Sequence, residues 1–280
     1  MAEKMIPGIP VSIALGVRRL VAPNPGMMTG PGTNTYLIGE HNVAVIDPGP
    51  YINDHLEAID KAAPGEIRWI LVTHTHPDHS PGAMPLAELT GAQLMGVGAP
   101  EGKIQDHTFV PHRVLNDGDL LDTEEFSIRA ICTPGHASNH LCYLHESLRL
   151  LFTGDHIMNG STVVIDPPDG NMKHYLESLE RLKELDLDSL APGHGHPIKK
   201  PLEAIDWLIN HRLSRESKVV ETLKSKPNLS LNQLTPFVYD DVDKQLHRLA
   251  SRSLLAHLQK LEENGLAVHK EERWCLSIKE

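Results

Sequence analysis

The stretch ILVTHTHPDHS at residues 70–80 decides the fold and the chemistry of this chain. A β-branched apolar run leads directly into four side chains that can bind a metal ion, namely His74, His76, Asp78 and His79. Side chains two residues apart on an extended backbone point to the same side, so His74 and His76 can bind one ion at a strand end. A proline then redirects the chain, which places Asp78 and His79 to bind a second ion nearby.

Three further polar side chains, His136, Asp155 and His194, each follow a strand-like run or lie in a glycine-rich turn. Glycine beside a ligand allows close backbone approach and positive φ, which tight turns often require. Imidazole and carboxylate groups form a suitable ligand set for zinc. We therefore expect one metal on His74, His76 and His136, and a second on Asp78, His79 and His194, with Asp155 bridging the two.

Short β-branched runs alternate with helical stretches from residue 35 to about residue 197, which indicates an α/β fold. Strands are expected at 35–38, 43–46, 67–72, 93–97, 127–131, 141–144 and 148–152. Helices are expected at 52–62, 81–90 and 173–185. The turn at 145–147 is short enough for a hairpin, so the sheets are expected to be mixed rather than purely parallel.

After Pro201 the pattern becomes almost entirely helical, with helices expected at 202–225, 230–237 and 243–264. The last helix is expected to end at Gly265, a usual C-terminal cap. Residues 266–278 alternate like two short strands around Glu271 and Glu272. Three helices and a small hairpin in this order are typical of a winged-helix-like module, so we predict domains at 1–209 and 210–280.

The composition indicates a globular protein of one large or two modest domains, because 40% of the 280 residues are hydrophobic and 22% are charged. The net charge of −11 argues against a surface that binds nucleic acid or anionic membrane over its whole extent. From residue 210 onward there are 12 basic and 10 acidic residues, against 14 and 27 before it. The acidic excess therefore belongs to the part that carries the metal-ligand pattern.

A cytoplasmic location without membrane contact is expected, because no apolar run reaches the length of a membrane helix and the first residues lack a targeting pattern. The three cysteines cannot all pair and show no CxxC spacing, which argues against a disulfide framework or a thiolate zinc cluster. The leucine-rich last helix fits a dimer interface as well as intramolecular packing, so the oligomeric state stays open.

The HxHxDH motif together with His136, Asp155 and His194 resembles the metallo-beta-lactamase superfamily. This resemblance implies an αββα sandwich with the metals at one edge between two sheets, followed here by the winged-helix-like region. It also implies a role for Asp47 in VIDPG, which matches a carboxylate that supports the ligands from behind. A carboxylate that orients metal-bound histidines is expected at such sites. Turn chemistry in the Asp-Pro-Gly sequence is the alternative explanation of Asp47.

The branch of the superfamily is narrowed by Asp155, because the commonest zinc beta-lactamases carry a cysteine at this position. A bridging aspartate is what thioesterases, lactonases, phosphodiesterases and RNA-processing members share. The sequences GTNTYL at 32–37, PGHG at 192–195 and HLQKLE at 257–262 are similar to the mitochondrial beta-lactamase-like endoribonuclease and its bacterial hydrolase relatives. That similarity implies metal-dependent cleavage of single-stranded RNA.

The mechanistic hypothesis is that two Zn²⁺ ions, with Mn²⁺ or Fe as alternatives, activate a water for attack on a phosphoryl or acyl group. Asp78 would bind the second metal and orient or deprotonate this water. His140, four residues beyond His136, is the candidate that protonates the leaving group if it faces the cleft. The alternative for His140 is a packing or ligand-supporting role.

Three other functions compete with RNA cleavage. The first is hydrolysis of a small thioester, lactone or similar acyl substrate, as in glyoxalase-II-like enzymes, and the acidic first domain is unfavourable for polyphosphate. The second is that of an iron-dependent oxygenase of the same superfamily, which would also use most of these ligands. The third, from a different class, is a nucleic-acid-binding regulator whose metal domain is a sensor. Binding without turnover would distinguish the regulator from an enzyme.

Overall fold

The computed structural model describes residues 4–102 and 104–277. These residues form two compact units, each discontinuous in sequence. The first unit comprises the described parts of 1–133, 139–161 and 185–204, and the second comprises those of 134–138, 162–184 and 205–280. The predicted domain boundary at 209/210 stays a prediction.

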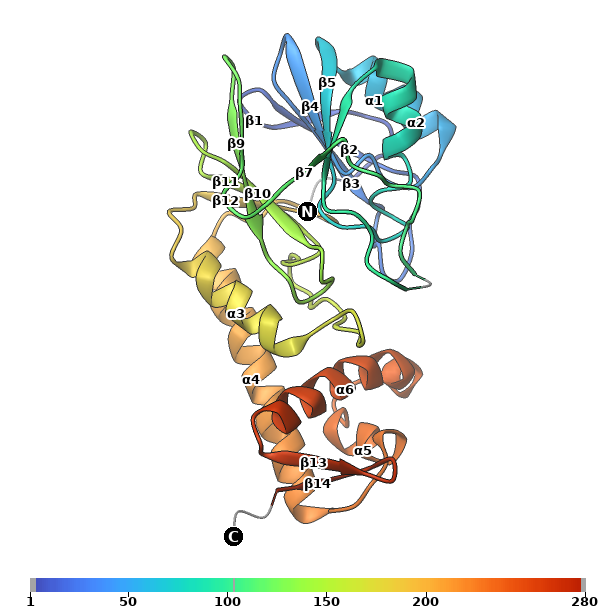
Figure 1. Ribbon diagram of the computed structural model, residues 1–280, viewed down its shortest axis with the longest axis vertical. Coiled ribbons are helices and arrows are strands. Elements are labelled where there is room, and N and C mark those ends of the chain that lie inside the picture. Colours follow the sequence, from blue (N-terminus) through green and yellow to red (C-terminus); the bar gives the residue numbers. More distant parts are fainter. Residues whose placement is uncertain (1–3, 103, 278–280) are drawn as a thin grey trace. The chain divides into compact units, whose positions relative to one another are not determined.

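The first unit contains a seven-stranded sheet with its strands in chain order, from β1 to β7. Strands β1 to β4 run antiparallel to their neighbours, and β4 to β7 run parallel, with helices in two of the parallel connections (Figure 1). The strands are β1 (Val11–Ala14), β2 (Val17–Val21), β3 (Asn34–Ile38), β4 (Asn42–Ile46), β5 (Glu66–Leu71), β6 (Gln93–Gly96) and β7 (Arg113–Val114), and the helices are α1 (Asn53–Ala62) and α2 (Ala83–Thr90).

A second sheet of five strands has the order β12-β11-β10-β9-β8. Its strands are β8 (Leu120–Asp122), β9 (Ser127–Cys132), β10 (Leu141–His145), β11 (Leu150–Gly154) and β12 (Ser189–Pro192). Strands β10 and β11 form the predicted hairpin, whereas β11 and β12 run parallel. Both sheets are therefore mixed, as the short turn predicted.

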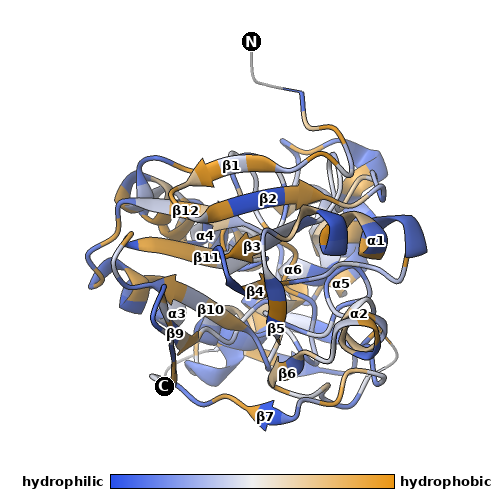
Figure 2. Ribbon diagram, turned by 90° about the horizontal axis from the view of Figure 1, so that it is seen from above, coloured by the Kyte–Doolittle hydropathy of each residue, from blue (hydrophilic) through white to orange (hydrophobic). Residues whose placement is uncertain are grey.

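Two apolar layers hold the first unit together. Between the sheets, Tyr36 and Ile46 of the first sheet share a buried cluster with Tyr143 and Phe152 of the second, and the rings of Tyr36 and Phe152 are 5.0 Å apart. The other face of the first sheet packs against buried residues of α1 and α2, such as Ile59. Strands covered on both faces become apolar along their whole length, as Figure 2 shows for β11.

The second unit contains a winged-helix arrangement of helices and a hairpin. Its elements are α3 (Met172–Lys183), α4 (Pro201–Ser225, which begins in the first unit), α5 (Leu231–Val238), the 3₁₀ turn η1 (Lys244–Leu246), α6 (His247–Glu263), β13 (Ala267–Lys270) and β14 (Arg273–Leu276). Val219, Leu234, Leu258 and Trp274 belong to one buried cluster that joins α4, α5, α6 and the hairpin.

The expected elements differ from the structure in two respects. Strands β1, β2, β7, β8 and β12 were not expected; β2 carries two arginines, β7 and β8 span two and three residues, and β12 ends in proline. The expected helix at 243–264 is wrong in its first turn, because Asp243 caps a 3₁₀ turn and α6 begins at His247. Among the described helices, none is long and apolar enough to cross a membrane.

Candidate metal centre

Four predicted ligands come together where strands of the first unit end. Asp78 and His79 lie in the turn after β5, Asp155 directly follows β11, and His194 follows β12. One ligand atom from each of these side chains lies within 4.8 Å of the others. The parallel pairing of β11 with β12 explains part of this convergence, because the carboxyl ends of the two strands lie side by side.

The distances within this group fit a tetrahedral ion site. His79 Nε2 lies 3.5 Å from Asp78 Oδ2 and 3.3 Å from Asp155 Oδ1. His194 Nε2 lies 3.2 Å from Asp78 Oδ2 and 3.3 Å from Asp155 Oδ1. Ligand atoms at zinc-ligand bond lengths of about 2.0–2.1 Å are about 3.3 Å apart along a tetrahedral edge. Within the described chain, neither Nε2 atom has a hydrogen-bond partner although both are buried.

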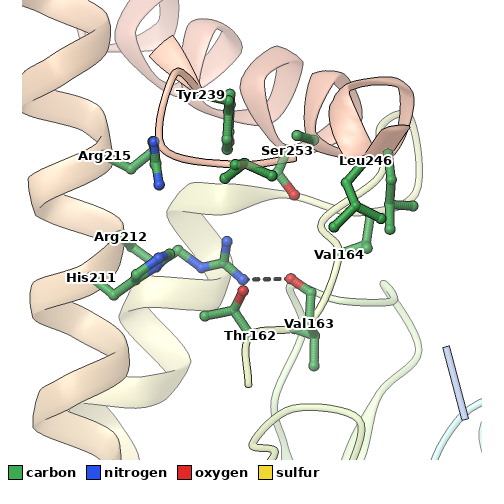
Figure 3. Close-up of a pocket in the computed structure, with 12 residues that line it drawn as sticks. Thr162, Val163, Val164, His211, Arg212, Arg215, Tyr239, Leu246 and Ser253 are labelled. Carbon is green, nitrogen blue, oxygen red and sulfur yellow. Dashed lines mark hydrogen bonds between the residues drawn. The ribbon is translucent and has the colours of Figure 1, made fainter. Parts of the chain in front are cut away.

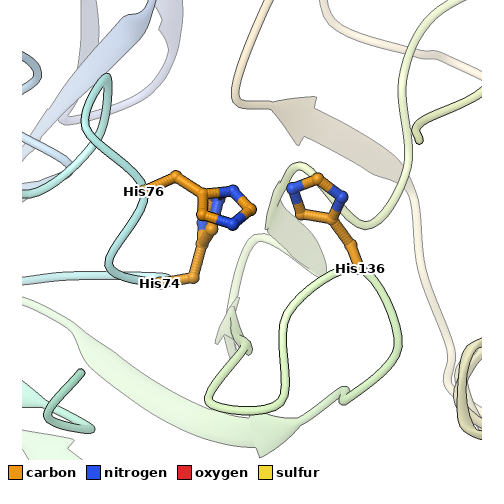
Figure 4. A group of neighbouring side chains, drawn as sticks. All are labelled: His74, His76 and His136. Carbon is orange, nitrogen blue, oxygen red and sulfur yellow. Dashed lines mark hydrogen bonds between the residues drawn. The ribbon is translucent and has the colours of Figure 1, made fainter. Parts of the chain in front are cut away.

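The second predicted group consists of His74 and His76 of the first unit and His136 of the second unit, and Figure 4 draws these three side chains. Within the first unit, His74 Nε2 is 2.9 Å from His76 Nδ1. His136 lies in the loop between β9 and β10. The structure thus places Asp155 with Asp78, His79 and His194, and the predicted ligand roles, including the bridging role of Asp155, stay predictions.

One buried carboxylate, Asp47, orients a histidine of each group. Asp47 Oδ2 is 2.9 Å from His79 Nδ1 and also accepts a hydrogen bond from the Thr73 hydroxyl at 2.7 Å. The same hydroxyl oxygen lies 3.0 Å from His74 Nδ1, and Asp47 Oδ1 accepts from the Thr73 amide. These contacts occupy Nδ1 of both rings and leave Nε2 for an ion, as metal-bound histidines require.

Backbone carbonyls fix two other histidines in the same way. His136 Nδ1 donates to the Val164 carbonyl at 2.8 Å, and His194 Nδ1 donates to the Gly32 carbonyl at 3.2 Å. Because a carbonyl only accepts, these contacts set the tautomer that carries the proton on Nδ1. In the neutral imidazole, Nε2 of each ring then has its lone pair available to an ion.

The turn that carries His194 is held by Asn34 and needs a glycine. The Asn34 side-chain amide donates to the carbonyls of Pro192 at 2.8 Å and Gly195 at 2.9 Å. A Cβ at Gly193 would lie 2.6 Å from Asp155 Oδ1, so a side chain there would intrude on the ligand atoms. This glycine therefore permits close approach rather than an unusual backbone conformation.

The electrostatics of the group favour a bound cation. Burial alone would raise the pKa of Asp155, but His194 and His79 outweigh burial and hold this pKa well below its usual range. Burial would likewise lower the pKa of His79, but Asp78, Asp155 and Asp47 raise it well above its usual value. Three carboxylates around one buried ring need positive charge for compensation, which a divalent ion supplies when the imidazoles are neutral.

His140 is placed differently from the predicted ligands. It is 1% exposed, and its Nδ1 lies 2.9 Å from the Thr133 hydroxyl. A Cβ at Gly154 would be 2.8 Å from His140 Nε2, so this ring is packed against the backbone. Protonation of a leaving group needs access to the cleft, and this burial argues for the packing alternative. The role of His140 as a proton donor stays a prediction.

Sequence reasoning missed several residues that position the ligands. Thr73 directly precedes His74, and Asn34 lies inside the GTNTYL motif, so both were visible in quoted motifs without being assigned a role. The carbonyls of Gly32 and Val164 leave no signal in the sequence, because any residue type can supply them.

Comparisons with known proteins identify both parts of the chain. The profile of the "Metallo-beta-lactamase superfamily" matches residues 28–194, and that of the "Beta-lactamase associated winged helix domain" matches residues 230–274. A "Beta-lactamase-like protein 2 homolog" of Drosophila melanogaster is 30% identical, covering 93% of this chain and 92% of the relative. An "Atrochrysone carboxyl ACP thioesterase" of Cryptosporiopsis sp. is 27% identical, covering 89% and 80%.

A solved structure confirms the fold. The crystal structure of a beta-lactamase domain protein from Burkholderia ambifaria superposes with a TM-score of 0.82 at 22% identity, covering 98% of this chain and 96% of that one. The predicted α/β sandwich with a C-terminal winged-helix region is therefore confirmed.

Proposed function

The chain belongs to the metallo-beta-lactamase superfamily and is a hydrolase of that fold, and from this premise we propose that it hydrolyses acyl thioesters with the help of two divalent metal ions. The observation that carries the metal-dependent part is the group of four ligand atoms at tetrahedral spacing with two buried Nε2 atoms that lack hydrogen-bond partners among the described residues.

The proposed metals are two zinc ions, with manganese or iron as alternatives that the same nitrogen and oxygen ligands accept. His74, His76 and His136 would hold one, Asp78, His79 and His194 the other, and Asp155 both. When bound, the ions lower the pKa of a shared water toward neutrality and polarise the group under attack.

Asp78 is the side chain of its group that faces solvent most. Its side chain is 26% exposed, against 14% for Asp155, 3% for His194 and 0% for His79. A substrate-binding metal site keeps one side open, and Asp78 lies on the open side of this one. We infer that the Asp78 carboxylate accepts the proton of the attacking water, while His79 and His194 hold this carboxylate in position.

The acyl substrate is favoured by the loop between β2 and β3. The turn between β2 and β3 carries Met27 and Met28, which are 79% and 52% exposed, and the Gly32 carbonyl at its base holds His194. Exposed methionines adapt to apolar chains of different shapes. The acidic excess before residue 210 would repel a polyanion, and one relative is described as a thioesterase of an acyl carrier protein.

Single-stranded RNA is the second candidate substrate. The likeness to the beta-lactamase-like protein 2 homologue extends over almost the whole chain and includes the winged-helix region. This region carries the slight basic excess from residue 210 onward, and winged helices resemble modules that bind nucleic acid. A nucleic-acid-binding regulator with a sensory metal domain would bind RNA without cleaving it.

The test compares both substrates on one preparation of the full chain. Zinc-loaded protein and manganese-loaded protein are each incubated with an S-acyl thioester and, separately, with labelled single-stranded RNA. The readouts are thiol release for the thioester and strand cleavage for the RNA. Asp78→Ala removes the proposed base, and Asp54→Ala, an exposed acid in the first turn of α1, is the matched control. We expect thiol release that Asp78→Ala abolishes and Asp54→Ala preserves.

Three other results would count against the thioesterase proposal. RNA cleavage that depends on Asp78, without thiol release, would show that RNA rather than a thioester is the substrate. RNA binding without turnover of either substrate would favour the regulator. Thiol release that survives thorough removal of metal would contradict the metal-dependent mechanism itself.

A further inference from the structure

A cavity of about 180 Å³ lies wholly within the second unit, and the residues that line it do not include the predicted ligands (Figure 3). Its walls come from α4, from η1 and α6, and from residues 162–164 of the loop that precedes α3. Figure 3 shows arginine side chains of α4 on one side and apolar side chains on the other. The cavity is therefore polar at one end and apolar at the other.

Two buried arginines form the polar end. Arg215 is bonded by both terminal nitrogens to Asp241 and lies 4.4 Å above the ring of Tyr239. Arg212 is 3% exposed, donates through Nη2 to the Val163 carbonyl, and has no hydrogen-bond partner for Nε among the residues described. A buried guanidinium is unfavourable without a partner of opposite charge. The guanidinium carbon of Arg212 lies 5.3 Å from the ring centroid of Tyr175, and no ion pair with a carboxylate is found for it among the residues described. Arg212 thus brings a buried donor without a partner, and a charge without a carboxylate, to the wall of the cavity.

The other charged and titratable groups at the polar end do not neutralise the charge of Arg212. Asp241 is shared between Arg215 and Lys218, so its negative charge is already matched. Burial and the two arginines lower the pKa of His211, so this ring adds no positive charge near neutral pH. The excess of positive charge at the cavity therefore belongs to Arg212.

The apolar end uses part of the leucine face of the last helix. Leu254, Leu258 and Leu261 of this face are fully buried in the winged-helix core, whereas Leu246 and Leu249 are only partly buried and line the cavity. Val164, Val242 and Ala250 complete the apolar lining. A pocket with an apolar lining and a few converging polar groups is typical of a small-molecule site.

We propose that this cavity binds a small organic acid, with its carboxylate on Arg212 and its hydrocarbon part against Leu246 and Leu249. A planar guanidinium offers two parallel donors that match a carboxylate. An apolar cavity of about 150 Å³ accommodates a benzene ring, so this one fits an acid of about the size of benzoate. This inference is independent of the substrate proposed above.

Occupancy of the cavity would also affect a predicted metal ligand. Residues 163–165 contact both the cavity wall and the predicted ligand. The Val163 carbonyl accepts a hydrogen bond from Arg212, and the Ile165 amide donates one to Ser253 Oγ on α6. Between them, the Val164 carbonyl accepts a hydrogen bond from His136 Nδ1. An acid that binds Arg212 competes with or reinforces the Val163 contact and so acts on the neighbouring carbonyl that orients His136. Coupling of this kind between two sites is reciprocal.

The experiment titrates the full-length, metal-free protein with benzoate and with benzyl alcohol, its uncharged analogue, by isothermal calorimetry. We expect benzoate to bind with a Kd of about 1 mM or tighter, and benzyl alcohol to bind about tenfold more weakly or worse. Because the protein is metal-free, failure of this proposal is distinguishable from failure of the proposed hydrolase activity.

Three variants make the result specific to the cavity. Arg212→Met removes the guanidinium, Ala250→Leu fills the apolar end, and Arg248→Met changes an exposed arginine of α6 outside the lining. The first two should weaken benzoate binding about tenfold or more, and the third should leave it unchanged. Equal binding of benzoate and benzyl alcohol, undiminished binding by Arg212→Met, or no binding of benzoate by folded protein would each overturn the proposal. Thermal unfolding checks that the variants are folded.

Discussion

Asp47→Asn is the substitution that most directly tests how the metal centre is built. Asp47 adopts a positive φ of 50°, and asparagine tolerates this conformation as well as aspartate does, so the backbone should be unaffected. The amide can keep its oxygen on the Thr73 N–H. Its nitrogen, however, then faces the Thr73 hydroxyl and His79 Nδ1, which both donate to Asp47 at present.

The size of the effect follows from these contacts. His79 Nδ1 loses its charged acceptor, a hydrogen bond worth about 1.5–3 kcal/mol, and the ring then favours the tautomer with the proton on Nε2. That tautomer cannot bind a metal through Nε2. The loss corresponds to about 10–100-fold in metal affinity, which agrees with the usual effect of removing a carboxylate behind a ligand histidine.

The assay is competition for zinc between the protein and a chromophoric chelator. Glu125→Gln is the matched control, because Glu125 also accepts hydrogen bonds from three backbone amides, those of Glu40, His41 and Asn42, but contacts none of the predicted ligands among the residues described. An Asp47→Asn protein that is folded and binds zinc as tightly as the control would refute the reasoning.

Three further predictions concern the same chain. Gly193→Ala should reduce bound metal and activity, because its Cβ would lie 2.6 Å from Asp155 Oδ1. Gly98→Ala should leave both unchanged, because its Cβ would meet only Pro111, at 3.9 Å. Metal analysis of the two variants checks this prediction. Chelation should lower the unfolding temperature in proportion to RT ln(1 + [L]/Kd), and an unchanged temperature would count against a metal that binds the folded state. Burial lowers the pKa of His257 to about 4, so its contribution to stability is present above the unfolded pKa of about 6.5 and is lost as pH falls toward 4. Urea unfolding of metal-free protein should therefore show a loss of about 2 kcal/mol between pH 7 and 5 that is much smaller in His257→Gln.

More of the candidate ligands than of the contacts that orient them could be predicted from the sequence. His74, His76, Asp78 and His79 were recognisable because four ligand-type side chains directly follow an apolar strand. Asp47 was assigned its supporting role only through the resemblance to the superfamily, because it is 26 residues from the Thr73 that it holds. The remaining acceptors, such as the Gly32 carbonyl, are backbone groups that no residue type indicates. Residue types alone indicate which side chains can bind a metal, whereas the orientation of these side chains depends on tertiary contacts that residue types do not specify.

The same distinction explains the fold. Central strands such as β4 and β5 are covered on both faces and are therefore apolar enough to recognise. Strand β2 reads VRRLV, and the two arginines obscure it, although Arg19 is 3% exposed in the structure. The edge strands β7 and β8 escaped recognition for another reason: an edge strand can be short and still pair, because its backbone rather than its side chains makes the sheet.

The spacing of the metal ligands is a consequence of the strand topology. Strands β5, β11 and β12 each end just before a ligand, and the Gly193 amide donates to the Gly154 carbonyl at 2.7 Å, which joins the two turns that carry Asp155 and His194. The Asn34 amide in turn donates to the Gly193 carbonyl at 2.7 Å, so β3 of the other sheet fixes the same turn. Both sheets thus hold the backbone around the ligands. Carboxylates brought this close by rigid strands cannot move apart to relieve their repulsion, and a bound cation is the simplest means of compensating it.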